Sequence, residues 1–205
     1  MTPTPSRRAF LLGMAAAAPA VLAACSSDDT AGHDAVAIGG QFEFVSPGGQ
    51  TVITYPVEER RPGGDVFGAS VSDENREIHL SDFAGSVVVL NAWGQWCAPC
   101  RSESDDLQAV HERMQAEGIG TVLGVNVRDN VRSAPADFLR DNGLTYPSIY
   151  DPPFVNAAAL GGIPATVIPT TVILDREHRP AVVMLKETDQ AELWGHVSAV
   201  AAEDA

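Results

Sequence analysis

The stretch that decides the fold is Val87-Val88-Val89-Leu90-Asn91-Ala92-Trp93, followed by Gly94-Gln95 and then by Trp96-Cys97-Ala98-Pro99-Cys100. Its first part is almost wholly apolar and lies between Gly85 and Gly94. A short continuous apolar run of this kind is typical of a strand that is buried on both faces of a sheet. We therefore predict a central strand over residues 87–93.

A helix is expected directly after this strand, over residues 97–117. Leu107, Val110 and Met114 recur at helical spacing, and Gly118 is a good stop signal. The two cysteines of Trp96-Cys97-Ala98-Pro99-Cys100 thus lie where a buried strand passes into a helix.

A cysteine at a helix N-terminus faces unpaired backbone N–H groups and the positive end of the helix dipole, which favour thiolate over thiol. Cys97 is predicted to be exposed there and to act as the nucleophile. Cys100, one turn further and partly buried, would attack the mixed disulfide and release the product. Pro99 is tolerated because the first helical turn has no N–H bond to lose.

Two other interpretations of the cysteine pair remain open. One is half of a zinc site, which would need two further Cys or His ligands at suitable spacing. The five histidines are scattered singly along the chain, and we expect no metal site; they are His33, His79, His111, His178 and His196. The other is an inert pair, which the strand-to-helix setting disfavours.

The rest of the chain continues the alternation of strands and helices. Ahead of the core, residues 41–45 and 51–55 alternate around Pro47-Gly48-Gly49 and predict a β-hairpin, and residues 60–77 predict a surface connection. After it we expect strands over 121–127, 146–150, 170–175 and 181–185, a helix capped by Ser133 and a final helix over 190–201. The order indicates an α/β fold: a central mixed sheet flanked by helices, with an N-terminal β-hairpin extension.

The N-terminal residues have the pattern of an export signal. Arg7 and Arg8 precede an apolar run over residues 9–24, shorter than the about 20 residues that span a membrane, although an uncleaved anchor remains an alternative. The run ends in Leu22-Ala23-Ala24-Cys25, which resembles a bacterial lipoprotein box, and residues 6–11 resemble a twin-arginine signal. We expect a signal peptide over 1–24, a lipidated flexible tether over 25–37 and one domain over 38–205.

Cysteine usage supports lipidation at Cys25. The chain has three cysteines, an odd number that needs an explanation in an exported protein. If lipid occupies Cys25, then Cys97 and Cys100 remain as one pair. A disulfide between residues so close in sequence constrains the unfolded chain very little, which favours a chemical role for the pair.

The chain is acidic, with a formal net charge of −14. Loss of Arg7 and Arg8 with the signal leaves 11 basic and 27 acidic residues, a net charge of −16. Nucleic acid and anionic lipid surfaces attract basic proteins, so neither is expected as a partner. We interpret the acidic composition as one that keeps an exported protein soluble.

Four segments together resemble the membrane-attached, thioredoxin-like proteins of the TlpA/ResA type: Leu80-Ser81-Asp82-Phe83-Ala84-Gly85, the strand over 87–93, Trp96-Cys97-Ala98-Pro99-Cys100-Arg101, and Ile168-Pro169-Thr170-Thr171. The resemblance covers the chain from about residue 41 to its end. It implies a thioredoxin-like fold and a thiol–disulfide oxidoreductase outside the cytoplasm. The redox centre would be the Cys97–Cys100 disulfide, with no other cofactor.

The resemblance also implies roles for neighbours of the cysteines. Pro169 matches the position of a cis-proline that faces the disulfide, where the backbone of Ile168 is left free to pair with a substrate peptide; a trans proline that opens a strand is the alternative. Trp96 is expected to shield the disulfide and contact substrate, and Trp93 to do this or simply pack in the core. Asn91 stands where ordinary thioredoxins have a buried aspartate.

Glu103 is the third expected catalytic residue. Helical steps back from Leu107 reach Glu103 and then Cys100, which places its carboxyl on the inward face beneath the sulfurs. Burial would raise the pKa of this carboxyl, its charge would raise those of the thiols, and it could move a proton during exchange. The alternative is an exposed acid in the first helical turn. In the resembled branch this position is a glutamate.

The function expected first is reduction of protein disulfides, with apocytochrome c as a candidate substrate and a membrane thiol donor as the source of electrons. Lipid at Cys25 would hold the protein on the outer face of the cell membrane. An oxidase that forms disulfides is the second expectation, since the redox potential decides the direction. A non-catalytic binding module or copper carrier is the third, although His178 is an unpromising copper ligand.

Overall fold

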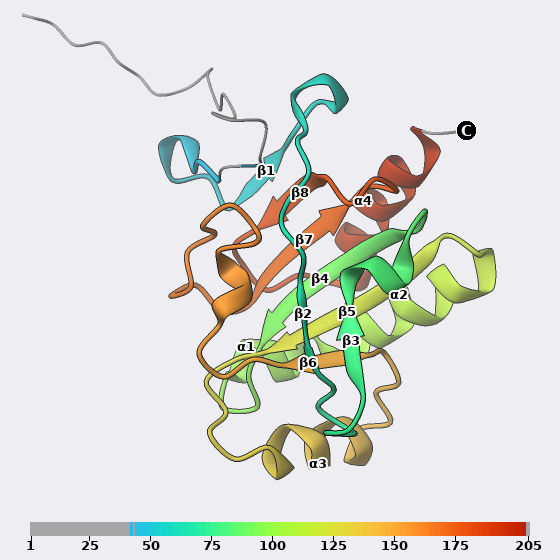
Figure 1. Ribbon diagram of the computed structural model, residues 1–205. Coiled ribbons are helices and arrows are strands. Elements are labelled where there is room, and N and C mark those ends of the chain that lie inside the picture. Colours follow the sequence, from blue (N-terminus) through green and yellow to red (C-terminus); the bar gives the residue numbers. More distant parts are fainter. Residues whose placement is uncertain (1–41, 43, 204–205) are drawn as a thin grey trace, which may run out of the picture. The chain divides into compact units, whose positions relative to one another are not determined.

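A computed structural model of the protein describes residue 42 and residues 44–203 (Figure 1). The expected signal peptide, Cys25 and the tether over 25–37 lie outside the described residues. Among the described residues, no helix is long and apolar enough to cross a membrane.

Strand β4, Val87–Trp93, is the centre of a six-stranded sheet, as predicted, and every residue in it is buried. It pairs in parallel with β5, Gly120–Asn126, and antiparallel with β7, Thr170–Leu174. The sheet order is β1-β8-β7-β4-β5-β6. The edge strands are β1, Val52–Thr54, and β6, Ser148–Tyr150, and β8, Pro180–Met184, lies between β1 and β7.

Burial on both faces of β4 divides the apolar interior into two cores. Successive side chains of a strand point to opposite faces, so Val88 and Leu90 pack into one core and Val87 and Val89 into the other. We call the first the hairpin-side core, which also holds Val66, Ile78, Leu160 and Ile163, and the second the helix-side core, which also holds Leu107, Met114, Leu193, Val197, Cys97 and Cys100. The cysteine pair therefore belongs to the helix-side core.

Four α-helices follow the expected order, with two differences. They are α1, Ala98–Ser102, α2, Ser104–Glu117, α3, Ser133–Asp141, and α4, Gln190–Ala202. The single helix expected over 97–117 is interrupted at Glu103, which ends α1 and precedes α2. Ser133 is the first residue of α3 rather than its N-cap, because Arg132 before it already has helical dihedrals (φ −53°, ψ −35°). Figure 1 shows α2 and α4 side by side along the sheet.

The pairing predicted for the N-terminal hairpin is wrong. Strand β1 forms within the expected 51–55 segment, but it pairs antiparallel with β8 at the edge of the main sheet. The backbone N–H groups of Phe42 and Phe44 donate instead to the carbonyls of Pro62 and Gly161. Pairing with β8 joins β1 to the main sheet, whereas a two-stranded hairpin isolated in solvent is only marginally stable. The tertiary contact therefore prevails over the local turn signal.

An antiparallel hairpin does precede the core, but it lies in the segment expected to be a surface connection. It consists of β2, Phe67–Ala69, and β3, Glu77–His79. Val66 and Ile78 are 0% and 1% exposed, so two apolar side chains fix this hairpin against the sheet. Four short 3-10 helices complete the described elements: Pro47–Gly49, Val57–Glu59, Leu80–Phe83 and Val155–Ala157.

Candidate active site

The two cysteines form a disulfide at the carboxyl end of β4, where α1 begins. Their Cα atoms are 5.3 Å apart. Cys97 is the N-cap of α1, and its Sγ accepts a hydrogen bond from the backbone N–H of Cys100 at 3.3 Å. Pro99 lies in the first turn, where no helical N–H bond is lost. Sulfur at position 97 therefore meets the N–H groups that favour a thiolate.

The expected exposure of Cys97 is wrong for this oxidised form. Cys97 is 4% exposed and Cys100 is 2% exposed. In the disulfide, both sulfurs are directed toward each other and pack in the helix-side core. Trp96 on one side of Cys97, and Ala98 and Pro99 on the other, are exposed, so the pair lies directly beneath the surface.

The Ile168–Pro169 peptide bond is cis, as expected. The carbonyl oxygen of Ile168 lies 3.8 Å from Cys97 Sγ, which brings a segment more than seventy residues away in sequence against the disulfide. Pro169 is buried, and Thr170 after it pairs with Ala92 of β4. The sheet register thus places the proline beside Cys97.

Glu103 is fully buried, with only 1% of its surface exposed. Its backbone N–H donates to the carbonyl of Pro99, so it follows Cys100 by one turn at the break between α1 and α2. Burial raises the pKa of Glu103 to about 7, although hydrogen bonds from Thr188 and Asn91 act in the opposite direction. A carboxyl with this pKa exchanges its proton near neutral pH.

Two neutral donors hold the Glu103 carboxylate. Asn91 Nδ2 donates to Oε1 at 2.9 Å, and the backbone N–H of Thr188 donates to Oε2 at 3.0 Å. Asn91 Nδ2 also donates to Thr171 Oγ1 at 3.1 Å, while its own buried Oδ1 has no hydrogen-bond partner in the part of the chain that the structure describes. Tyr146 lies close enough for the charge of Glu103 to add to the rise of its pKa, which comes mainly from burial.

Sequence reasoning missed Thr188 and Thr171 as partners in this arrangement. Thr171 belongs to the Ile168-Pro169-Thr170-Thr171 segment, so that motif could have indicated it. Thr188 contacts Glu103 through a backbone N–H across 85 residues of sequence, and no residue type signals such a contact.

The two tryptophans near the motif differ in role. Trp96 is 44% exposed beside Cys97, and its Nε1 donates to the carbonyl of Val127 at 3.0 Å. Trp93 is 2% exposed and its Nε1 donates to Ser148 Oγ at 2.9 Å, so it is part of the core. Trp96 alone of the two offers an indole surface to a protein that approaches the disulfide.

Within residues 42 and 44–203, no group of three or more His, Cys, Asp and Glu side chains is placed to hold a metal ion. His178 lies in the turn between β7 and β8, where its Nε2 is 3.1 Å from the carbonyl of Phe83. The antiparallel register of β7 puts that turn at the opposite end of β4 from Cys97. His178 is therefore not a ligand that could act with the cysteines.

This fold and this site define a thioredoxin-like thiol–disulfide oxidoreductase, in which a CxxC pair at a helix start faces a cis-proline. The model of the AhpC/TSA family matches residues 64–179, and the chain belongs to that family. The thiol–disulfide oxidoreductase ResA of Bacillus subtilis is 28% identical over 123 residues, which are 60% of this chain and 66% of that protein. The TlpA/ResA resemblance is confirmed by these matches.

Two solved structures are more similar in sequence. The structure of a secreted thiol-disulfide isomerase from Corynebacterium glutamicum is 55% identical, with a TM-score of 0.78, and the match covers 80% of this chain and 99% of that one. That of a DsbF homologue from Corynebacterium diphtheriae is 52% identical, with a TM-score of 0.74 over 78% of this chain and 99% of the other. The expected α/β thioredoxin-like fold class is thus confirmed.

Proposed function

We propose that the protein reduces disulfide bonds of other proteins outside the cytoplasm. In its dithiol form, the Cys97 thiolate attacks one sulfur of a substrate disulfide and the other substrate sulfur leaves. Cys100 then attacks Cys97 Sγ, which closes the Cys97–Cys100 bond and releases the second substrate sulfur. Two electrons pass to the substrate, and two protons complete its thiols.

The observation that carries this direction is the buried carboxyl of Glu103, one turn beyond Cys100. When ionised, its charge opposes a thiolate nearby, and when protonated it has a proton to give. A less stable thiolate makes the dithiol form a better electron donor, because strong oxidants of this chemistry stabilise their reduced form. Glu103 also offers a base for Cys100, whose thiol is buried when it must attack.

Disulfide formation or isomerisation is the second candidate. It is favoured by the relative from Corynebacterium glutamicum, which is described as a secreted thiol-disulfide isomerase and is 55% identical. The same two cysteines would carry either reaction, since the relative stability of the dithiol and the disulfide sets the direction.

The cellular setting is part of the proposal. The Leu22-Ala23-Ala24-Cys25 segment and the odd number of cysteines support a lipid on Cys25 and a position on the outer face of the cell membrane. An exported reductant needs electrons, and a membrane protein with a dithiol is the chemical class of donor proposed. Apocytochrome c is the candidate substrate, because its haem-binding cysteines must be reduced before haem attachment.

The reduction potential of the Cys97–Cys100 pair, measured against glutathione and dithiothreitol buffers, tests the direction. We expect a value below the about −180 mV of protein disulfide isomerase. A value near about −120 mV, that of a strong oxidant, would replace the proposal with the second candidate. The same protein should reduce insulin disulfides with dithiothreitol as electron source, and Cys97→Ser should lose this activity entirely.

A further inference from the structure

Two arginines contact the dipeptide that precedes Cys97. Arg101 Nη1 donates to the carbonyl of Gln95 at 2.7 Å. The guanidinium of Arg128 lies 5.6 Å from the ring centroid of Trp96. Both arginines are exposed, so their charges face the solvent from which a substrate disulfide approaches. We call Trp96, Arg101 and Arg128 the cationic rim.

Neither of these guanidinium groups has a carboxylate partner among the described residues. Their hydrogen bonds go to backbone carbonyls, of Gln95 for Arg101 and of Ala165 for Arg128. Five other basic side chains are instead paired with carboxylates: Arg60, Arg113, Arg140, Arg179 and Lys186. A guanidinium has five N–H donors and matches a carboxylate with two of them, so each arginine of the rim keeps donors for a ligand.

The backbone fixes the position of Arg128. Its φ is 58°, in the left-handed region that is uncommon for a residue with a side chain, and its N–H donates to the carbonyl of Pro152 at 3.0 Å. From there the side chain reaches Ala165, in the segment that leads to Ile168 and Pro169. Arg128 thus connects both segments that border Cys97.

One carboxylate, that of Asp129, also contacts this dipeptide, but it is buried. Asp129 accepts hydrogen bonds from the N–H of Gln95 at 2.8 Å and from Asn126 Nδ2 at 2.7 Å, and it is 7% exposed. Its carboxylate is used inside the protein and presents little surface to a ligand. Asp105 and Asp106 lie in the first turn of α2, which starts beyond the break at residue 103.

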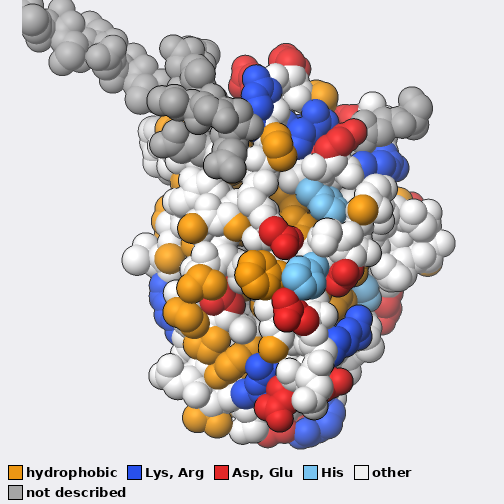
Figure 2. Space-filling view, in the orientation of Figure 1, with side chains coloured by type: hydrophobic (Ala, Val, Ile, Leu, Met, Phe, Trp, Pro, Cys, Tyr) orange, Lys and Arg blue, Asp and Glu red, His pale blue; other side chains and the backbone are white. Residues whose placement is uncertain are grey.

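We propose that the cationic rim selects disulfides whose flanking residues are Asp or Glu. This inference rests on the proposed function and names its substrate class. The net charge of −14 does not oppose it at close range, because physiological salt screens exposed charges beyond about 8 Å. Figure 2 shows acidic and basic side chains interspersed on the face that it presents, so short-range charges vary from place to place. Next to the disulfide, Arg101 and Arg128 are exposed charges that contact the two residues before Cys97.

Three cyclic disulfide peptides that differ only in their flanking pair, Glu-Glu, Gln-Gln or Lys-Lys, test the proposal. The full chain is reduced, freed of reductant and mixed with each peptide, and the rate of peptide reduction is divided by that of dithiothreitol with the same peptide. This division removes the effect of flanking charge on the peptide thiols. We expect the Glu-Glu peptide to react about five-fold faster than the Lys-Lys peptide at 0.15 M NaCl, where the net charge of the chain is screened beyond about 8 Å, and less than two-fold faster at 0.5 M NaCl.

Matched variants test whether Arg101 and Arg128 cause the preference for the Glu-Glu peptide. The double substitution Arg101→Gln with Arg128→Gln should bring the three normalised rates together, whereas Arg128→Lys, which keeps the charge, should keep their order. Arg61→Gln is the control, because Arg61 is exposed and bonds only backbone carbonyls in the segment of Arg60, at the far end of the sheet. It should leave the preference unchanged.

Equal normalised rates in the wild type, a faster Lys-Lys peptide, or a preference that survives in the double variant would each overturn the proposal. The neutral bis(2-hydroxyethyl) disulfide separates this failure from that of the proposed function. If the wild type reduces it while the peptides show no preference, only the charge selection fails. If the wild type reduces neither this compound nor any peptide, both proposals fail.

Discussion

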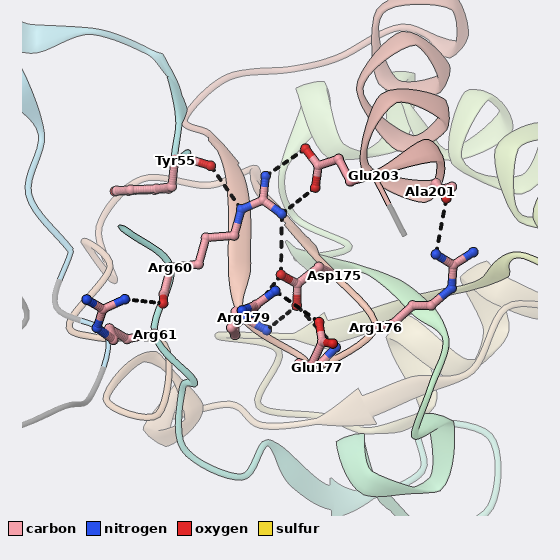
Figure 3. Close-up of polar contacts among 9 residues, drawn as sticks. All are labelled: Tyr55, Arg60, Arg61, Asp175, Arg176, Glu177, Arg179, Ala201 and Glu203. Atoms are coloured by element: carbon pink, nitrogen blue, oxygen red, sulfur yellow. Dashed lines mark hydrogen bonds and ion pairs between the residues drawn. The ribbon is translucent and has the colours of Figure 1, made fainter. Parts of the chain in front are cut away.

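Strand β7 runs between two buried carboxylates. Asp175 follows its last residue, and Glu103 is linked through Asn91 to Thr171, near its first. Both residues are 1% exposed. Asp175 Oδ2 is 3.3 Å from Arg60 Nη1 and 2.8 Å from Arg179 Nε, and Figure 3 shows both guanidinium groups directed at it. Among the described residues, the Glu103 carboxylate has only the side-chain amide of Asn91 and the backbone N–H of Thr188 as hydrogen-bond donors.

This difference in partners distinguishes the two ends of the sheet. The end with Asp175, which we call the structural end, holds its carboxylate with cations, and the end with Glu103, which we call the reactive end, does not. Arg60 is buried and also binds Glu203 at the end of α4 and the carbonyl of Tyr55, so it joins the N-terminal segment to the last helix (Figure 3). Removal of one partner from a buried ion pair of this kind is strongly destabilising, because it leaves a buried charge uncompensated. Glu103 has no cation to fix its ionisation, and its proton is therefore free to leave near neutral pH.

Removal of the Arg60 guanidinium from the structural end of the sheet should have the largest effect on stability. We expect Arg60→Met to lower the free energy of unfolding by about 3–5 kcal/mol, because Asp175 and Glu203 lose a shared partner. Urea unfolding at pH 7 measures this. Arg140→Met, which breaks only exposed ion pairs, should leave the urea midpoint unchanged. Equal midpoints for both variants would remove the distinction between the two ends.

The reactive end should respond to pH instead. The pKa of Glu103 is raised to about 7 in the folded protein, so the folded chain binds this proton more tightly than the unfolded chain. Its contribution to stability is full below about pH 4.5 and is lost as the pH rises through about 7. In the oxidised form, the wild type should therefore lose about 2–3 kcal/mol more than Glu103→Gln between pH 5 and pH 8.

The difference between the two proteins isolates Glu103, because His79 and His111, whose pKa values are raised and lowered respectively, titrate in both. Urea unfolding at several pH values gives the two curves. Parallel curves would mean that the carboxylate of Glu103 is as well compensated as that of Asp175.

A smaller effect is expected from the neutral donor beside Glu103. Asn91→Leu removes the side-chain hydrogen bond that favours the ionised carboxyl, so the pKa of Glu103 should rise by about one further unit, equivalent to about 1.4 kcal/mol. Carbon-13 NMR of the glutamate carboxyl in the oxidised protein follows this titration. Thr171→Val is the control, since Thr171 contacts Asn91 but makes no hydrogen bond to Glu103. An unchanged midpoint in Asn91→Leu would show that the hydrogen bond from Asn91 does not contribute to this pKa.

Much of the fold was predictable because its signals are local. The apolar run of β4, the stripe and glycine stop of α2, and the Ile168-Pro169 motif each lie within a few residues. Strand β4, the end of α2 and the cis-proline are found where expected, although the helix is interrupted at Glu103. The burial of Glu103 was also predictable from its helical spacing to Leu107. The hairpin over 41–55 was not, since β1 has its hydrogen-bond partner more than a hundred residues away in β8.

The sequence by itself determined the two cysteines at a helix start, the buried strand before them and the carboxyl one turn after them, because these depend on periodicity and spacing along one segment. Only the tertiary structure decided that Cys97 is covered in the disulfide form, that Thr188 and Asn91 hold Glu103, and that Arg128 lies over Trp96. Those contacts join segments that meet only when the sheet register and the loops are fixed. Burial and charge at the site are therefore properties of the folded chain.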